Sequence, residues 1–160
     1  MTTRRDFLLL ACGATAAAGL PGPAGAQLPP NIIALRKQAL EEAIGKTTGG
    51  VAPRKGRVTL EVPPLIDNGN SVPITVKVES PMTAEDHVKA IHVFTEKNPQ
   101  PYIISAHLGP RSGRAAVTTR GRIADSGRII AIAQLSDGSF WTDEVSVIVT
   151  LSACLEDGLI

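Results

Sequence analysis

The feature that most constrains this chain is a period-two alternation of apolar and polar residues, which runs from Arg57 almost to the C-terminus. Side chains on a β-strand point alternately to its two faces, so each alternating run is predicted to be a strand with one apolar face. The runs are "RVTLEV", "ITVKVES", "HVKAIHVF", "YIISAHLG", "AAVTTRGRI", "RIIAIAQL" and "EVSVIVTL". Turn-forming residues separate them, in "DNGNS", "EKNPQP", "GPRSG", "ADSG" and "SDGS". Seven short strands at this spacing predict an all-β fold, an antiparallel β-sandwich. The chain has no Cys-Trp-Cys core pattern, so the sandwich is expected to be immunoglobulin-like in architecture only.

Before these strands, residues 31–45 ("NIIALRKQALEEAIG") are predicted to form one short helix. Its apolar residues recur near helical spacing: Ile32, Leu35, Ala39 and Ile44. Gly45 is expected to end the helix, and the Gly- and Pro-rich stretch "KTTGGVAPRKG" that follows is predicted to be a linker.

The N-terminus has the pattern of an export signal. Paired Arg4 and Arg5 precede an apolar run over residues 7–20 and a small-residue site that ends at Ala26. Paired arginines are typical of the twin-arginine route, so we expect export to the periplasm and cleavage after Ala26. Lipidation at Cys12 is the alternative, but only five apolar residues precede that cysteine. The expected organisation is a signal peptide at 1–26, a helix and linker at 27–56, a β-sandwich at 57–151 and a C-terminal arm at 152–160.

Removing the signal changes the charge and the cysteine count. Arg4, Arg5 and Asp6 leave with it, so 16 basic and 15 acidic residues become 14 of each. A neutral chain gives no support for binding nucleic acid or an acidic membrane surface. Cys154 becomes the only cysteine. An unpaired thiol in an exported protein indicates a reactive sulfur or an intermolecular bond; an inert buried cysteine is the alternative.

Apart from Cys154, the sequence shows no set of residues typical of an enzyme active site or a metal site. The histidines lie singly on or beside the predicted strands, without paired ligand spacing: His87, His92 and His107. No His or Met follows Cys154 and Met82 lies far upstream, so a blue-copper ligand set does not converge, and no cofactor or metal is expected. Nothing near Cys154 supplies an oriented base or an oxyanion pocket.

Two further groups have ordinary structural interpretations. Arg111 and Arg114 lie in the "GPRSGR" turn, where solvated charges are the default, although the pair suits an anion. Phe140 and Trp141 follow a Gly turn and are expected to pack in the core or at a subunit contact.

Several stretches together resemble the SoxY family, the sulfur-carrier subunit of the periplasmic thiosulfate-oxidising Sox system. They are "NGNSVPITVKVESPMTAEDHVKAIHVFTEKNPQP", "SGRAAVTTRGRIADSGRIIAIAQLSDGSFW" and "VIVTLSAC", in the family's order. The resemblance implies a β-sandwich that pairs with a SoxZ-like subunit. It also implies a C-terminal arm whose cysteine, here Cys154, holds sulfur intermediates covalently while SoxAX-, SoxB- and SoxCD-like enzymes visit it transiently. The carrier itself needs no catalytic base, because those enzymes do the chemistry.

The tip of the arm departs from the family pattern, which is Gly-Gly-Cys-Gly-Gly. The residues around Cys154 are Ser152, Ala153, Leu155, Glu156, Asp157 and Gly158. Residues other than glycine restrict the backbone, and the two carboxylates are expected to raise the pKa of the thiol. The chain is therefore a variant carrier, or a SoxY-like protein that has lost or changed its cargo. Two other functions stay open: a pairing or scaffold module with a structural Cys154, and a small-ligand or metal-binding sandwich that uses His92 and His107.

Overall fold

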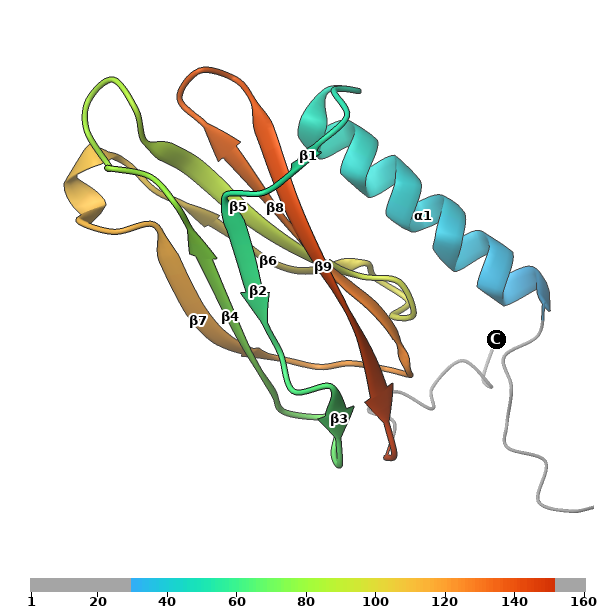
Figure 1. The fold of residues 1–160 in the computed structure, drawn as a ribbon. Coiled ribbons are helices and arrows are strands. Elements are labelled where there is room, and N and C mark those ends of the chain that lie inside the picture. The colour runs from blue at the N-terminus through green and yellow to red at the C-terminus, as the bar shows by residue number, and fades with distance from the viewer. Residues whose placement is uncertain (1–29, 152–160) are drawn as a thin grey trace, which may run out of the picture.

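The computed structural model describes residues 30–151, which form one helix and a two-layered β-sandwich (Figure 1). The elements in chain order are α1 (Pro30–Thr48), β1 (Arg54–Lys55), β2 (Val58–Glu61), β3 (Leu65–Ile66), β4 (Val72–Val78), β5 (Val88–Thr95), β6 (Tyr102–His107), the 3₁₀-helix η1 (Pro110–Ser112), β7 (Ala116–Gly121), β8 (Gly127–Leu135) and β9 (Phe140–Val149). Within this part of the chain no helix is long and apolar enough to cross a membrane.

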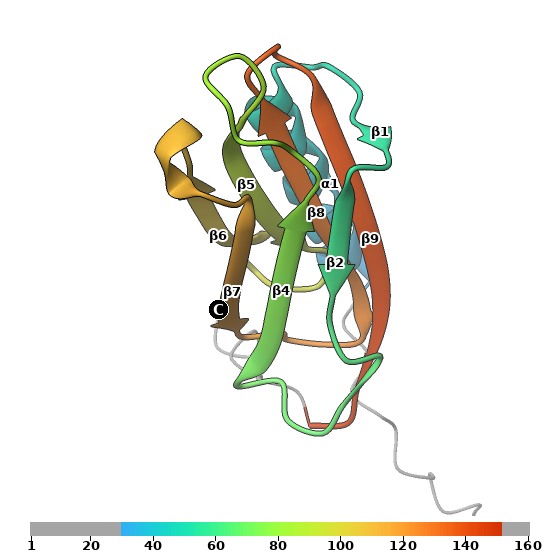
Figure 2. The ribbon, with the colours of Figure 1, turned by 60° about the vertical axis from the view of Figure 1, so that its left-hand side comes forward.

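The strands form two sheets that face each other (Figure 2). The larger sheet has the order β1-β9-β8-β5-β6, with β3 also pairing β9, and the smaller has the order β2-β4-β7. All seven predicted strands are present, and their pairings with one another are antiparallel. The prediction of an all-β, immunoglobulin-like antiparallel sandwich is therefore confirmed. The sequence did not predict β1 and β3, which are two residues long and pair with β9 in parallel.

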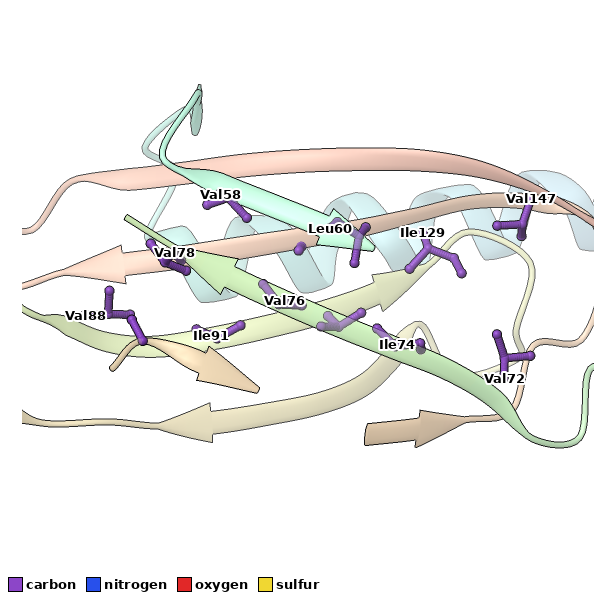
Figure 3. Packing of buried hydrophobic residues seen from close by; sticks show 14 of the residues in the cluster. Val58, Leu60, Val72, Ile74, Val76, Val78, Val88, Ile91, Ile129 and Val147 are labelled. Atoms are coloured by element: carbon purple, nitrogen blue, oxygen red, sulfur yellow. The ribbon is translucent and has the colours of Figure 1, made fainter. Parts of the chain in front are cut away.

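The main core lies between the sheets and comes directly from the period-two pattern (Figure 3). On β4 the inward side chains are almost completely buried, while Pro73 and Lys77 face solvent. The core residues drawn in the close view include Val58, Leu60, Val72, Ile74, Val76, Val78, Val88, Ile91, Ile129 and Val147. Burying one such aliphatic side chain stabilises the fold by about 1.5–3 kcal/mol, so this layer contributes most of the apolar stabilisation.

A second, smaller core holds α1 on the outer face of the larger sheet (Figure 2). It contains Leu40, Ala43, Phe94, Ile130, Ile132 and Phe140. Because β8 is covered on both faces, Ile129 to Ala133 are all buried and the run does not alternate. Phe140 packs here, as the sequence predicted.

The helix differs from its prediction in its face and its end. Leu35, expected on the apolar face, is 62% exposed, and Arg36 is buried beside Leu40 instead. Arg36 reaches this position because its guanidinium donates to the carbonyl oxygen of Lys97. The helix continues through Gly45 to Thr48 and ends at the Gly49–Gly50 pair, whose positive φ angles of 62° and 83° only glycine adopts easily.

Candidate functional site at the C-terminal end of the sandwich

The residues that the sequence selects as the site lie beyond the described part of the chain. They are Cys154 and its neighbours Ser152, Ala153, Leu155, Glu156, Asp157 and Gly158. The part of the chain that the structure describes ends at Leu151, two residues after β9.

The chain is tied to the sandwich up to that point. The amide of Thr150 donates to the carbonyl oxygen of Ile66 at 2.9 Å, and its hydroxyl donates to the carbonyl oxygen of Asp67 at 3.0 Å. One residue further on, the carbonyl oxygen of Leu151 accepts a hydrogen bond from the amide of Gly69 at 2.8 Å. Strand β3 and the turn after it therefore hold the backbone through Leu151.

The turn that makes this last contact is the "NGN" of the family stretch "NGNSVPI". The side-chain oxygen of Asn68 accepts hydrogen bonds from the Asn70 amide at 2.9 Å and from its side-chain nitrogen at 3.0 Å. Such a side-chain contact two residues ahead is how Asn fixes a turn. Gly69 lies buried between, and its carbonyl oxygen accepts from the amide of Ile123 at 2.8 Å. A function for "NGN" follows from these contacts: the turn joins the end of β9 to the rest of the sandwich.

Exposed apolar residues lie on β3, on β9 and just after β9. Leu65 and Ile148 are register partners on β3 and β9, and they face outward because the next pair, Ile66 and Val149, is buried. Leu65 is 58% exposed, Ile148 62% and Leu151 57%. These are three of the seven large hydrophobic residues that are exposed within residues 30–151.

The other family stretches have structural roles that the contacts identify. In "NPQP", the side chain of Asn98 donates to the carbonyl oxygen of Arg122 at 2.8 Å and accepts from the amide of Ala124 at 2.7 Å. In "SDGSFW", hydrogen bonds from Ser139 hold the pKa of Asp137 below its usual value. These stretches shape loops, and neither assembles a reactive group among the described residues.

The sequence predicted that each histidine stands alone, and for His92 and His107 that prediction is wrong. His92 on β5 and His107 on β6 lie side by side, with ring centroids 6.1 Å apart and the rings nearly perpendicular. Nδ1 of His92 shares a hydrogen bond with the hydroxyl of Ser105 at 2.8 Å. Burial, and then the neighbouring His107, lower the pKa of His92. Sequence spacing missed the pair because only the register of β5 against β6 brings the two residues together.

The pair does not extend to a larger ligand set. Over residues 30–151, no group of three or more His, Cys, Asp or Glu side chains is placed to hold a metal ion. Structural zinc sites use four such ligands and catalytic sites three. Arg111 and Arg114 are both exposed around η1, as expected for a solvated turn.

The fold and the placement of the possible metal ligands define the class of protein. The chain is an immunoglobulin-like β-sandwich with an outer helix, and no group of three or more metal-ligand side chains is assembled in its described part. The family model for "Sulfur oxidation protein SoxY" matches residues 44–154, well over half of the chain. The chain therefore belongs to the SoxY family of sulfur oxidation proteins.

The solved structure of a SoxY protein agrees with this assignment. The sulfur carrier protein SoxY from Chlorobium limicola f. thiosulfatophilum is similar with a TM-score of 0.58 and 26% identity, over 71% of this chain and 98% of that one. A superoxide reductase (neelaredoxin) from Ignicoccus hospitalis has a TM-score of 0.53 at 18% identity, over 59% of this chain and 80% of that one, which is a likeness of fold alone. No curated protein matches the sequence.

Proposed function

We propose that this chain is a covalent carrier of sulfur intermediates in periplasmic thiosulfate and sulfur oxidation, with Cys154 as the attachment site. The observation that carries the proposal is where the family match ends. It runs to residue 154, so it includes the lone cysteine beyond the signal and stops there. The SoxY of Chlorobium limicola is itself a sulfur carrier protein, which supports the same role for this chain.

The chemistry requires only a thiolate that other proteins can reach. When Cys154 takes up thiosulfate, its Sγ forms an S–S bond to the outer sulfur, and one proton and two electrons leave. A partner redox protein must accept those two electrons. The conjugate can then be attacked at sulfur by partner enzymes, which supply the base and the binding pocket themselves. The carrier is accordingly not an enzyme.

The remaining parts of the proposal concern export and partners. The twin-arginine signal, cleaved after Ala26, delivers the folded chain to the periplasm, where a thiol-based carrier meets its oxidising partners. A SoxZ-like subunit pairs with the sandwich, and SoxAX-, SoxB- and SoxCD-like enzymes bind it in turn. Free strand edges such as that of β6, which ends the larger sheet, are suited to cover by a second subunit.

Attachment is tested by intact-mass spectrometry after exposure to tetrathionate. The thiolate attacks one inner sulfur of tetrathionate, forms the Cys–S–S–SO₃⁻ conjugate and releases thiosulfate, so no other oxidant is needed. The wild type should gain the mass of one bound S₂O₃ group, and dithiothreitol should remove it. Cys154→Ser should gain none. These masses refer to the chain cleaved after Ala26; in the uncleaved chain, where Cys12 is a second thiol, the same comparison is made in the Cys12→Ser background.

The same experiment separates the alternative functions. A Cys154 thiol that neither tetrathionate nor iodoacetamide modifies in the folded protein would contradict the carrier and favour a pairing module with a structural cysteine. A metal ion that stays bound in Cys154→Ser and is lost in His92→Ala would favour the small-ligand or metal-binding sandwich.

A further inference from the structure

The turn after β3 contains the only asparagine of the chain that is followed by glycine, Asn68 before Gly69. The side-chain amide of an asparagine is open to attack by the main-chain nitrogen of the next residue. The attack is fastest when that residue is glycine, because glycine has no β-carbon to obstruct the approach. The other asparagines of the chain are followed by Ile32, Ser71 and Pro99. Asn68 is therefore the asparagine whose sequence makes it most reactive.

The reaction is a deamidation, and it consumes only water. The Gly69 nitrogen gives up its proton to a base in the solvent and bonds to Cγ of Asn68, and the side-chain nitrogen leaves as ammonia. Water then opens the resulting five-membered succinimide at either of its carbonyl groups. One opening gives aspartate. The other gives isoaspartate, in which the main chain runs through the former side chain.

In the folded protein, both reacting groups take part in hydrogen bonds. The amide of Gly69 donates to the carbonyl oxygen of Leu151 at 2.8 Å. Oδ1 of Asn68 accepts from the amide of Asn70 at 2.9 Å and from its side-chain nitrogen at 3.0 Å. Asn68 is exposed, so water and base reach it, whereas Gly69 is buried. The Gly69 amide must therefore separate from Leu151 before it can lose its proton and attack.

That separation requires the end of β9 to open. Thr150, next to Leu151, is bound to the same segment that carries Asn68. Its amide donates to the carbonyl oxygen of Ile66 at 2.9 Å, and its hydroxyl donates to the carbonyl oxygen of Asp67 at 3.0 Å. The hydrogen bonds that hold the end of β9 therefore also limit the reaction of Asn68.

We infer that Asn68 is a site of spontaneous deamidation controlled by the end of β9: it reacts when Leu151 separates from Gly69, and isoaspartate at position 68 keeps Leu151 from binding again. Isoaspartate adds one carbon–carbon bond of about 1.5 Å to the main chain before Gly69. The carbonyl oxygen of Gly69 accepts from the amide of Ile123 at 2.8 Å, so the lengthened chain cannot keep both hydrogen bonds of Gly69. The inference does not depend on whether Cys154 carries sulfur.

The test follows the deamidation of Asn68 in the folded and in the unfolded protein. The purified protein is kept at mildly alkaline pH with and without guanidinium chloride and is then digested with trypsin. The peptide 58–77 contains both Asn68 and Asn70, so its fragment masses assign a gain of one dalton to one of them. In guanidinium chloride, Asn68 should deamidate faster than Asn70. In the folded protein, Asn68 should deamidate at least about tenfold more slowly, because the opening breaks several hydrogen bonds and each slows the reaction roughly two- to tenfold.

Thr150→Val tests the link to β9. The substitution keeps the shape of the side chain and removes the hydroxyl that donates to Asp67, so Asn68 in the folded protein should deamidate about threefold faster. Thr142→Val is the matched control, because Thr142 lies on the same strand and its hydroxyl donates to the carbonyl oxygen of Ala131 at 2.9 Å. It should leave the rate at Asn68 unchanged. Thermal unfolding checks that both variants are folded, and if Thr150→Val is not, the comparison of folded and unfolded wild type still decides the question.

Hydrogen exchange measured by NMR tests the effect of the product. The deamidated protein is purified by anion exchange and compared with Asn68→Asp, which has the same charge and a normal main chain. The Gly69 amide hydrogen should exchange at least about tenfold faster in the deamidated protein, because its partner Leu151 is no longer bound.

Each of four results would overturn the inference. Equal rates at Asn68 in the folded and the unfolded protein would show that the hydrogen bonds do not control the reaction. Faster deamidation at Asn70 than at Asn68 would place the site elsewhere. Equal rates in Thr150→Val and Thr142→Val would separate the reaction from the end of β9. Equal exchange of the Gly69 amide in the deamidated protein and in Asn68→Asp would show that Leu151 binds again after the reaction.

Discussion

Replacing Leu40 with alanine tests whether α1 is held to the sheet as the structure shows. Leu40 is 3% exposed and belongs to the small core with Phe94, Ile130 and Ile132. The substitution removes three buried carbons, each worth about 0.8 kcal/mol, so transfer alone predicts about 2.4 kcal/mol. A residual cavity adds to this cost, but a helix held by one face can shift to close it. We therefore expect the free energy of unfolding to fall by about 2–3 kcal/mol.

The measurement is urea unfolding, followed by helix circular dichroism and by the fluorescence of Trp141, the single tryptophan. Leu35→Ala is the matched control, since the same change is made on the same helix at a side chain that is 62% exposed. It should alter the free energy of unfolding by no more than about 0.5 kcal/mol. The two probes should report one transition if helix and sandwich unfold together.

A loss below about 1 kcal/mol for Leu40→Ala, or equal losses for the two variants, would refute the packing argument. The first result would mean that α1 is not docked through Leu40. The second would mean that the helix presents the face which its sequence pattern predicted, with Leu35 inward.

Two further predictions concern the sheets. A β-carbon at Gly121 would lie 2.7 Å from Cγ2 of Ile103, so Gly121→Ala should lower the free energy of unfolding by about 1–3 kcal/mol. Gly45 lies inside α1, and a β-carbon there would meet no atom within 4 Å beyond its chain neighbours and the nearby helix backbone. Gly45→Ala should therefore raise the free energy of unfolding by about 0.5–1 kcal/mol; similar effects of the two substitutions in urea unfolding would contradict the close contact at Gly121. Burial and His107 lower the pKa of His92 from its ordinary value of 6.5, so NMR titration should give a lower value that rises toward 6.5 in His107→Ala. Because the unfolded chain binds this proton more readily, stability should decline as pH falls from 6.5 through the folded pKa and stay level above 6.5; a His92 pKa at or above 6.5 would contradict this.

The sequence alone determined the sandwich and the residue to test. Each strand shows apolar–polar alternation within its own residues, and each turn contains its own Gly, Pro, Asn or Asp. The strands and turns can therefore be predicted from local sequence, before any partner strand is known. The same holds for Cys154, whose position near the end of the chain and isolation from other cysteines are facts of the sequence.

Only the tertiary structure decided which surfaces meet. The buried face of α1 includes Arg36 and excludes Leu35, because the contact of Arg36 with Lys97 spans sixty-one positions of the chain. His92 and His107 become neighbours through the register of two strands. Strand β3 is too short to carry a period, yet its pairing with β9 anchors the end of that strand. Each of these depends on residues far apart in sequence, and so on a register that no local pattern specifies.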